Sequence, residues 1–334
     1  MLVKKTSWRP AGIAALWAAI PPAAGLLGLI AAPAQAQDYP SKPIRVVLEF
    51  AAGAQGDINM RSVTGQWSRI AGQPVVVENR PGAGGVLAAE AAIRAAPDGY
   101  TLLGSTTSSL ILRPHLVKAN TIDMSRDLTP ITGLWSSPSV LVVSSSLPVK
   151  SVQELIDHAR NNPDKVAYGT TGIGTTHHFN GEQVQFYTGV RLRHIPYKPN
   201  NQNFIDAAAG EIAMVIGNYG VSRPILKTEK IRLLAVIEGR SSLLPGVPGL
   251  GELIPGFSSV PNPAMLFAPA RLPDALVRRI NADVVKALTT QEVKDVITDG
   301  DTIGETPEAF RNRLQTQIAV VAKIAKAANI QPSN

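Results

Sequence analysis

The stretch IRVVLEFAAGAQGD, Ile44–Asp57, decides how the rest of the chain is interpreted. Its first half, Ile44–Phe50, is rich in apolar and β-branched residues and predicts a buried strand. Small residues follow, and a helix is predicted over 57–70. Asp57 is the expected N-cap of this helix, whose free amide groups can bind an anion. The stretch therefore predicts a strand–loop–helix unit with a glycine-containing loop suited to a ligand.

The same alternation continues almost to the C-terminus. Further strands are predicted over 74–78, 100–104, 140–144, 166–170, 192–195, 212–217, 231–237 and 264–268. Helices are predicted over 85–95, after the capping sequence at Ser151, over 177–187, and in two tail segments that begin near Pro273 and Thr306. Alternation of this kind is typical of βαβ units, so we predict an α/β protein with mostly parallel sheets flanked by helices.

Two irregular segments divide this pattern. One lies near 134–138, and the other is the proline- and glycine-rich run 244–263. Two boundaries around a middle segment predict a discontinuous first unit to which the tail helices return. We place lobe 1 at 37–137 plus 262–334 and lobe 2 at 138–261.

Composition excludes several classes of protein. The chain has 334 residues, with 32 Lys and Arg against 25 Asp and Glu, for a net charge of +7. Three of the basic residues lie within the first 36 residues, which leaves 29 against 25, or +4, for the remainder. These charges are scattered, so no nucleic-acid partner is expected. The absence of Cys from the sequence excludes disulfides, thiolate-bound metals and a thiol nucleophile.

The N-terminal 36 residues have the pattern of a secretory signal. Basic residues at Lys4, Lys5 and Arg9 precede the apolar stretch 11–30, and Ala34-Gln35-Ala36 is a typical cleavage site. The alternative is an uncleaved membrane anchor, which the double proline at 21–22 and the cleavage site disfavour. The mature chain is therefore expected to begin at Gln37 and to be a soluble periplasmic protein.

A second glycine loop follows the strand predicted over 166–170. It reads YGTTGIGTT, Tyr168–Thr176, and precedes a predicted helix. Its hydroxyls and amides are suited to a carboxylate. Neither loop matches the dinucleotide fingerprint GxGxxG with its partner acid, and neither is followed by the Gly-Lys-Ser/Thr of a phosphate-binding loop.

Several further runs resemble one known family. They include YPSKPIR (39–45), GQPVVVENRPGAGG (72–85), PDGYTLL (97–103), HIPYK (194–198) and LPGVP (244–248). Together with the two glycine loops, the chain resembles the Bug proteins, the periplasmic substrate-binding proteins of tripartite tricarboxylate transporters. The resemblance covers essentially the whole mature chain.

The resemblance implies two α/β lobes of the type II periplasmic-binding kind, with a carboxylate ligand bound between the two glycine loops. It implies a membrane transporter as partner and no enzymatic activity. The expected ligand-binding residues are Ala52, Gly53, Ala54, Asp57, Thr106, Thr170, Gly172, Gly174, Thr175, Thr176 and Asn218.

One departure from the family pattern bears on the ligand. The family usually has Pro before the Phe of the first loop, whereas this chain has Glu49. If the Glu49 carboxylate lines the site, it repels a polyanion and favours a monocarboxylate or an amino-acid-like ligand. If it points away from the site, it has no such effect. Glu49 is therefore a candidate specificity residue.

Other functions are not expected. His177 and His178 are adjacent, so on a helix their side chains diverge by about 100° and do not readily share a metal ion. No Gly-x-Ser-x-Gly motif of a hydrolase is present in the sequence. We expect no cofactor, no metal and a monomer. An orphan binding protein that acts as the ligand sensor of a membrane kinase is the alternative function.

Overall fold

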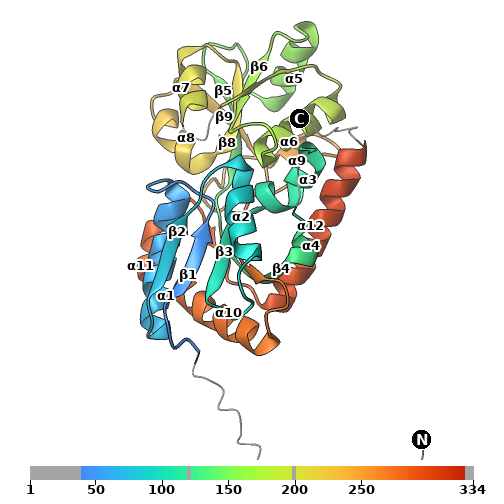
Figure 1. Ribbon diagram of the computed structural model, residues 1–334. Helices are drawn as coiled ribbons and strands as arrows, with labels where there is room; N and C mark the ends of the chain where they lie inside the picture. The colour runs from blue at the N-terminus through green and yellow to red at the C-terminus, as the bar shows by residue number, and fades with distance from the viewer. Residues whose placement is uncertain (1–38, 119–121, 198–200, 328–334) are drawn as a thin grey trace, which may run out of the picture. The chain divides into compact units, whose positions relative to one another are not determined.

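The computed structural model describes residues 39–118, 122–197 and 201–327 (Figure 1). Within them the strands form two sheets. The first sheet has the strand order β11 (Asp301–Thr302), β4 (Leu128–Ser136), β10 (Ala264–Pro269), β3 (Thr101–Thr106), β1 (Ile44–Leu48) and β2 (Val75–Asn79). The second has the order β7 (Arg193–Pro196), β6 (Ala167–Thr170), β8 (Met214–Asn218), β5 (Ser139–Ser144) and β9 (Ile231–Val236).

Helices cover both faces of the first sheet. One face packs against α1 (Gln55–Ala71), α10 (Asp274–Leu288) and α11 (Gln291–Val296). The other packs against α2 (Val86–Ile93), the π-helical turn η2 (Ser108–Leu112), α3 (Arg113–Leu116), α4 (Met124–Asp127) and the long α12 (Pro307–Ala327). A short 3-10 turn, η1 (Ala83–Gly85), precedes α2.

The second sheet is also covered on both faces. Buried residues of α5 (Val152–Asn161), α6 (Thr176–Thr188) and α9 (Leu250–Leu253) form one cluster with it. On the other face lie α7 (Gln202–Ala209) and α8 (Tyr219–Leu226). The predicted α/β class and the two-lobed arrangement are thus confirmed.

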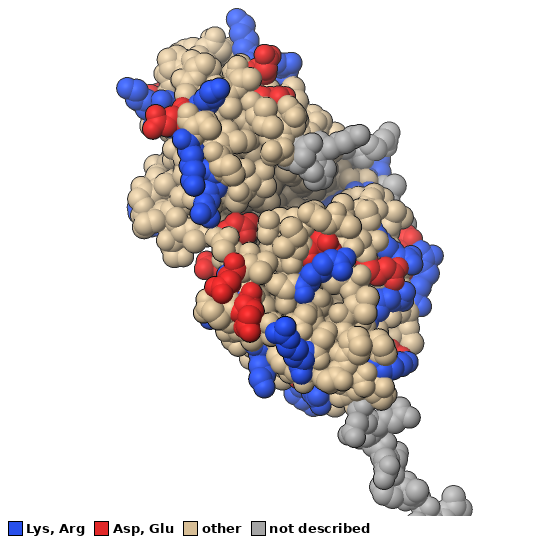
Figure 2. Space-filling model, turned by 90° about the vertical axis from the view of Figure 1, so that its left-hand side faces the viewer, with Lys and Arg blue, Asp and Glu red and all other residues tan. Residues whose placement is uncertain are grey.

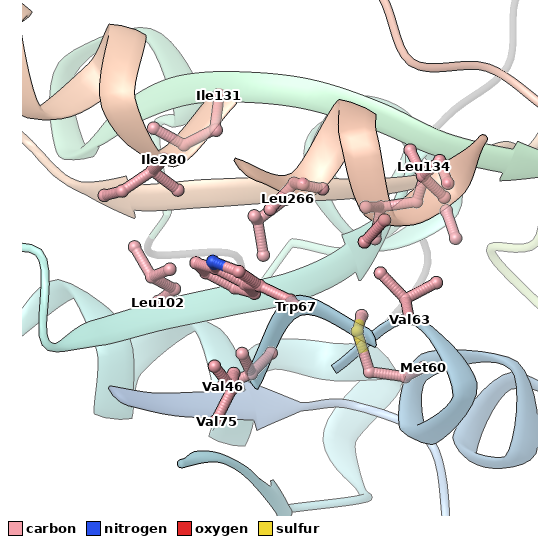
Figure 3. Packing of buried hydrophobic residues seen from close by; sticks show 14 of the residues in the cluster. Val46, Met60, Val63, Trp67, Val75, Leu102, Ile131, Leu134, Leu266 and Ile280 are labelled. Carbon is pink, nitrogen blue, oxygen red and sulfur yellow. The ribbon is translucent and has the colours of Figure 1, made fainter. Parts of the chain in front are cut away.

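The core of the first sheet shows why α1 forms where it does. Met60, Val63 and Trp67 follow one another at helical spacing and are at most 1% exposed. Figure 3 shows them meeting Leu102 and Leu266 from the sheet. Burial of the Trp67 indole and these aliphatic side chains stabilises the packing of α1 on the sheet, and thereby the β1–α1 unit that carries the first glycine loop.

The sheets are mixed, which corrects the prediction of mostly parallel pairing. In the first, β1 pairs parallel with β2 and β3, whereas β10 is antiparallel to β3 and β4, and β11 is antiparallel to β4. In the second, β5 is antiparallel to β8 and β9. β4 carries the chain out of the first sheet and β10 brings it back, so the two necessarily run in opposite directions.

The signal sequence predicted over 1–36 lies outside the described residues. Among the residues described, no helix is both long enough and apolar enough to cross a membrane.

Candidate functional site

A cavity of about 540 Å³ lies where loops of the two sheets meet. Three groups of first-sheet segments contribute to it: the β1–α1 region, the ends of β3, β4 and β10, and the turn before β11. The second sheet contributes the end of β8 and one face of α8. The lining residues are Phe50, Gln55, Gly56, Asn59, Thr106, Trp135, Ser137, Asn218, Gly220, Val221, Arg223, Pro224, Lys227, Asn262, Ala264, Thr298 and Asp299.

The charges of the cavity come from both lobes. Arg223 lies on α8, and Lys227, one turn later, is the C-cap of this helix. Asp299 also lines the cavity, and its side chain packs against Gly220 near the start of α8. A methyl group added at Gly220 would approach the Asp299 Cβ to 2.6 Å. On the face shown in Figure 2, a group of acidic side chains lies just below the indentation between the upper and lower halves, and basic side chains lie directly above it and also on the lower half.

The first glycine loop is built differently from the sequence prediction. Ala54, not Asp57, is the N-cap of α1, and Asp57 is the third helical residue. The Asp57 carboxylate reaches back to accept hydrogen bonds from the Gly53 amide at 2.9 Å and from Arg61 and Asn79. Burial works to raise the pKa of Asp57, but these hydrogen bonds lower it below its ordinary value. Asp57 therefore shapes the loop from within.

Of the predicted first-loop residues, Ala52, Gly53 and Ala54 are exposed and do not belong to the cavity wall. The next turn supplies the wall instead, through Gln55, Gly56 and Asn59. Gln55 donates a hydrogen bond to Asn59 at 2.8 Å, so these two amides lie on one face of α1. Their four-residue spacing at a helix start is the signal that sequence reasoning missed.

The second glycine loop is hydrogen-bonded mainly within itself. Thr175 is the N-cap of α6: its hydroxyl accepts from the His178 amide and donates to the Gly172 carbonyl at 2.8 Å. The Thr170 hydroxyl lies 2.7 Å from the His194 Nε2 and accepts from the Gly172 amide. Gly174 packs against Leu116 and Val117, and the Thr176 amide donates to the Ser108 hydroxyl at 3.1 Å. None of these loop residues lines the cavity.

His177 links this loop to the crossover between the sheets. Its Nδ1 lies 2.8 Å from the Thr171 hydroxyl, and its Nε2 lies 3.4 Å from the Ser139 hydroxyl. Burial lowers the pKa of His177 to about 4, against an opposing hydrogen bond with the cavity residue Asn218. His178 has other partners, since it stacks on His194 with ring centroids 4.2 Å apart. Among the described residues no group of three His, Asp or Glu is arranged to hold a metal ion.

Thr106 and Asn218 are the two predicted ligand residues that do line the cavity. Glu49, the candidate specificity residue, does not line it but lies behind Thr106. The Thr106 hydroxyl donates to one oxygen of the Glu49 carboxylate at 2.8 Å, and the Ser105 hydroxyl donates to the other at 2.5 Å. Burial raises the pKa of Glu49, although hydrogen bonds from Ser105, Ser109 and Thr106 oppose this effect.

The chain is similar to known proteins along most of its length. A family model described as "Tripartite tricarboxylate transporter family receptor" matches residues 59–328. The "UPF0065 protein in gbd 5'region" of Cupriavidus necator is 38% identical over 87% of this chain and 86% of its own length. Protein BugT of Bordetella pertussis is 32% identical over 86% of this chain and 90% of its own.

Solved structures agree with the sequence relatives. The R. palustris protein Rpa4515 with adipate has a TM-score of 0.78 at 30% identity, over 88% of this chain and 100% of its own. MatC from Rhodopseudomonas palustris with bound malate has a TM-score of 0.74 at 25% identity, over 86% of this chain and 100% of its own.

Proposed function

The chain belongs to the family of tripartite tricarboxylate transporter receptors, and we propose from this that it binds a small carboxylate in the cavity between its sheets and delivers it to the membrane subunits of such a transporter. Receptors of this family bind solutes and are not enzymes, and the resemblance to the Bug proteins is confirmed. We also propose that the receptor works in the periplasm after cleavage of the signal before Gln37.

The observation that carries the proposal is the charge of the α8 face. Arg223 and Lys227 line the cavity, and neither forms an ion pair with any residue that the structure describes. Cations at a cavity wall attract an anion, and a hydrogen bond to a charged group contributes about 1.5–3 kcal/mol. Relatives with adipate and with malate support a small carboxylate as the ligand class.

The side-chain amides complete the recognition of a carboxylate. Asn262 accepts from the Ser108 amide and hydroxyl through its Oδ1, which leaves its NH₂ group to donate into the cavity. Asn59 likewise accepts from Gln55 through Oδ1. The lobes proposed at 37–137 plus 262–334 and at 138–261 would thus supply amides from one side and cations from the other.

Titration calorimetry of the mature protein with mono-, di- and tricarboxylates tests the proposal. The double variant Arg223→Gln/Lys227→Gln should bind the preferred carboxylate roughly ten- to a hundredfold or more weakly. The matched control is Arg193→Gln/Lys230→Gln, which removes two exposed basic side chains of the same lobe outside the cavity. Equal affinity in both double variants, or no carboxylate bound by the unmodified protein, would contradict the proposal.

A further inference from the structure

We propose that Glu49 is a positioning residue that holds the Thr106 hydroxyl as a hydrogen-bond acceptor, so that the ligand is a carboxylate that also bears a hydroxyl or amino group. The inference rests on the proposed function and narrows its ligand class. Thr106 lines the cavity, and Glu49 accepts the hydrogen bond of its hydroxyl from outside the cavity wall.

Glu49 is surrounded by donors. Its two carboxylate oxygens accept from the Ser105 and Thr106 hydroxyls, and Ser109 and the Thr106 backbone also hydrogen-bond to it. Gly85 leaves room for this arrangement, because a Cβ there would lie 2.5 Å from both a Glu49 oxygen and the Ser109 hydroxyl. Among the described residues Glu49 forms no ion pair. When it is ionised, the Glu49 carboxylate has no proton of its own, so the neighbouring hydroxyls donate toward it.

The hydroxyl of Thr106 has only one proton. That proton is directed to Glu49 at 2.8 Å, so only lone pairs remain for any other contact. The Ser109 hydroxyl lies 3.4 Å from the Thr106 hydroxyl, but its single proton serves Glu49 as well. The polar contact that Thr106 can still offer in the cavity is therefore that of an acceptor.

A second acceptor lies in the same cavity. Asp299 accepts from the Ser137 hydroxyl at 3.1 Å through Oδ2, while its Oδ1 is shielded from solvent and has no partner in the described part of the chain. An ionised carboxylate only accepts hydrogen bonds, so a ligand group that carries a proton is the complementary partner for Asp299 in the cavity. A carboxylate alone has no such proton, whereas a hydroxyl or ammonium group has one.

Matched ligands test the inference. The trio succinate, malate and aspartate differs only in the substituent on C2, and so does the trio propionate, lactate and alanine. Calorimetry at pH 8 is suitable, because a high pH favours the ionised Glu49 carboxylate, which is the state to be measured. In at least one trio the unmodified protein should prefer a hydroxy or amino member over the unsubstituted acid by roughly three- to tenfold or more.

The variant Glu49→Gln should abolish this preference. Its amide can donate to Thr106, which frees the Thr106 proton for the ligand, so oxaloacetate should gain affinity relative to malate. Thr106→Val should lose the preference as well, and Thr106→Ser should retain it. Ser105→Ala is the control, since Ser105 donates to the same carboxylate but does not line the cavity; it should leave the preference unchanged. Thermal denaturation of each variant verifies that it is folded.

Two failures are distinguishable. If the unmodified protein binds no carboxylate of either trio or of the wider panel, the proposed function is overturned, and the inference with it. If carboxylates bind but unsubstituted members bind as well as substituted ones, or if Glu49→Gln keeps the preference while folded, the inference alone is overturned.

Discussion

At the scale of single residues, the polar side chains of both glycine loops serve mainly the loops themselves. Asp57 accepts from the Gly53 amide, and Thr175 bridges the Gly172 carbonyl and the His178 amide. Both residues are of the types that sequence reasoning assigns to a ligand, because an N-cap and an anion contact require the same hydroxyls and carboxylates. Only the partners in the folded chain distinguish the two roles.

Thr175→Val tests this distinction. The substitution keeps the shape of the side chain and removes the N-cap hydroxyl of α6, so we expect the free energy of unfolding in urea to fall by about 1 kcal/mol. The affinity for the carboxylate found by calorimetry should change little, because Thr175 does not line the cavity. The opposite result, normal stability with binding weakened tenfold or more, would place this hydroxyl on the ligand as the sequence predicts.

At the scale of elements, α6 is the helix that couples the lobes. It follows the second glycine loop, yet its Phe179 is fully buried in the cluster formed with η2 and α12 of the first sheet. The next residue, Asn180, accepts a hydrogen bond through Oδ1 from the amide of Val260, in the segment that leads back to the first sheet. α6 therefore packs apolar and polar groups against the first lobe, on segments that do not line the cavity.

Phe179→Ala should be strongly destabilising. Removing a fully buried phenylalanine costs about 3–5 kcal/mol in the free energy of unfolding. Phe186→Ala on the same helix is the control, since Phe186 is 47% exposed and its loss should cost less than about 1 kcal/mol. Equal losses for the two variants in urea denaturation would show that Phe179 is not an anchor between the lobes.

The strand β4, Leu128–Ser136, was not predicted from the sequence. β4 contains Pro130 and Gly133, both disfavoured in strands. On the side of β4 that faces away from β10, the strand β11 pairs only with Trp135 and Ser136. At Pro130 that side of β4 is therefore a sheet edge, and the proline, which has no amide proton, interrupts no hydrogen bond between strands. Tertiary position thus permits a strand that local propensity argues against.

At the scale of the whole molecule, Glu238 lies where the chain crosses between the sheets. Its Oε2 accepts from the amide of Ser139, the first residue of β5, at 2.8 Å, and its Oε1 is shielded without a partner among the described residues. Burial raises the pKa of Glu238 to about 7. The folded protein therefore holds a proton that the unfolded chain releases near pH 4.5.

The stability that Glu238 contributes therefore decreases as the pH rises. The stabilisation from the Glu238 proton is complete below about pH 4.5 and is lost as the pH rises to about 7, a change on the order of 3 kcal/mol. Glu238→Gln should lack this loss, so its stability relative to the unmodified protein should rise between pH 5 and 7.5 and then level off. The depressed pKa of His177 is common to both proteins and cancels in this difference.

Urea denaturation across that pH range measures the difference. Glu211→Gln, an exposed glutamate of the same lobe, is the control and should give a flat difference. A flat difference for Glu238→Gln too would mean that Glu238 is ionised throughout and plays no part in the pH dependence.

The sequence by itself determined the family, the α/β class and the position of most elements. These follow from local signals: Ile44–Leu48 and Met60–Trp67 carry their periodicity in neighbouring residues, and α5, α10 and α12 begin within a residue of the predicted capping or proline positions. Thr106 and Asn218, two of the ligand-binding residues that the family resemblance implies, line the cavity.

Only the tertiary structure decided the rest. The antiparallel pairing of β10, the edge position of β4 and the cavity wall of Gln55, Arg223 and Asp299 depend on segments far apart in the chain. The direction in which Glu49 points is likewise settled by Ser105 and Thr106, more than fifty residues away. A residue type states which hydrogen bonds a side chain can make, but its partners exist only after the chain has folded, and those partners decide whether it builds the loop or faces the ligand.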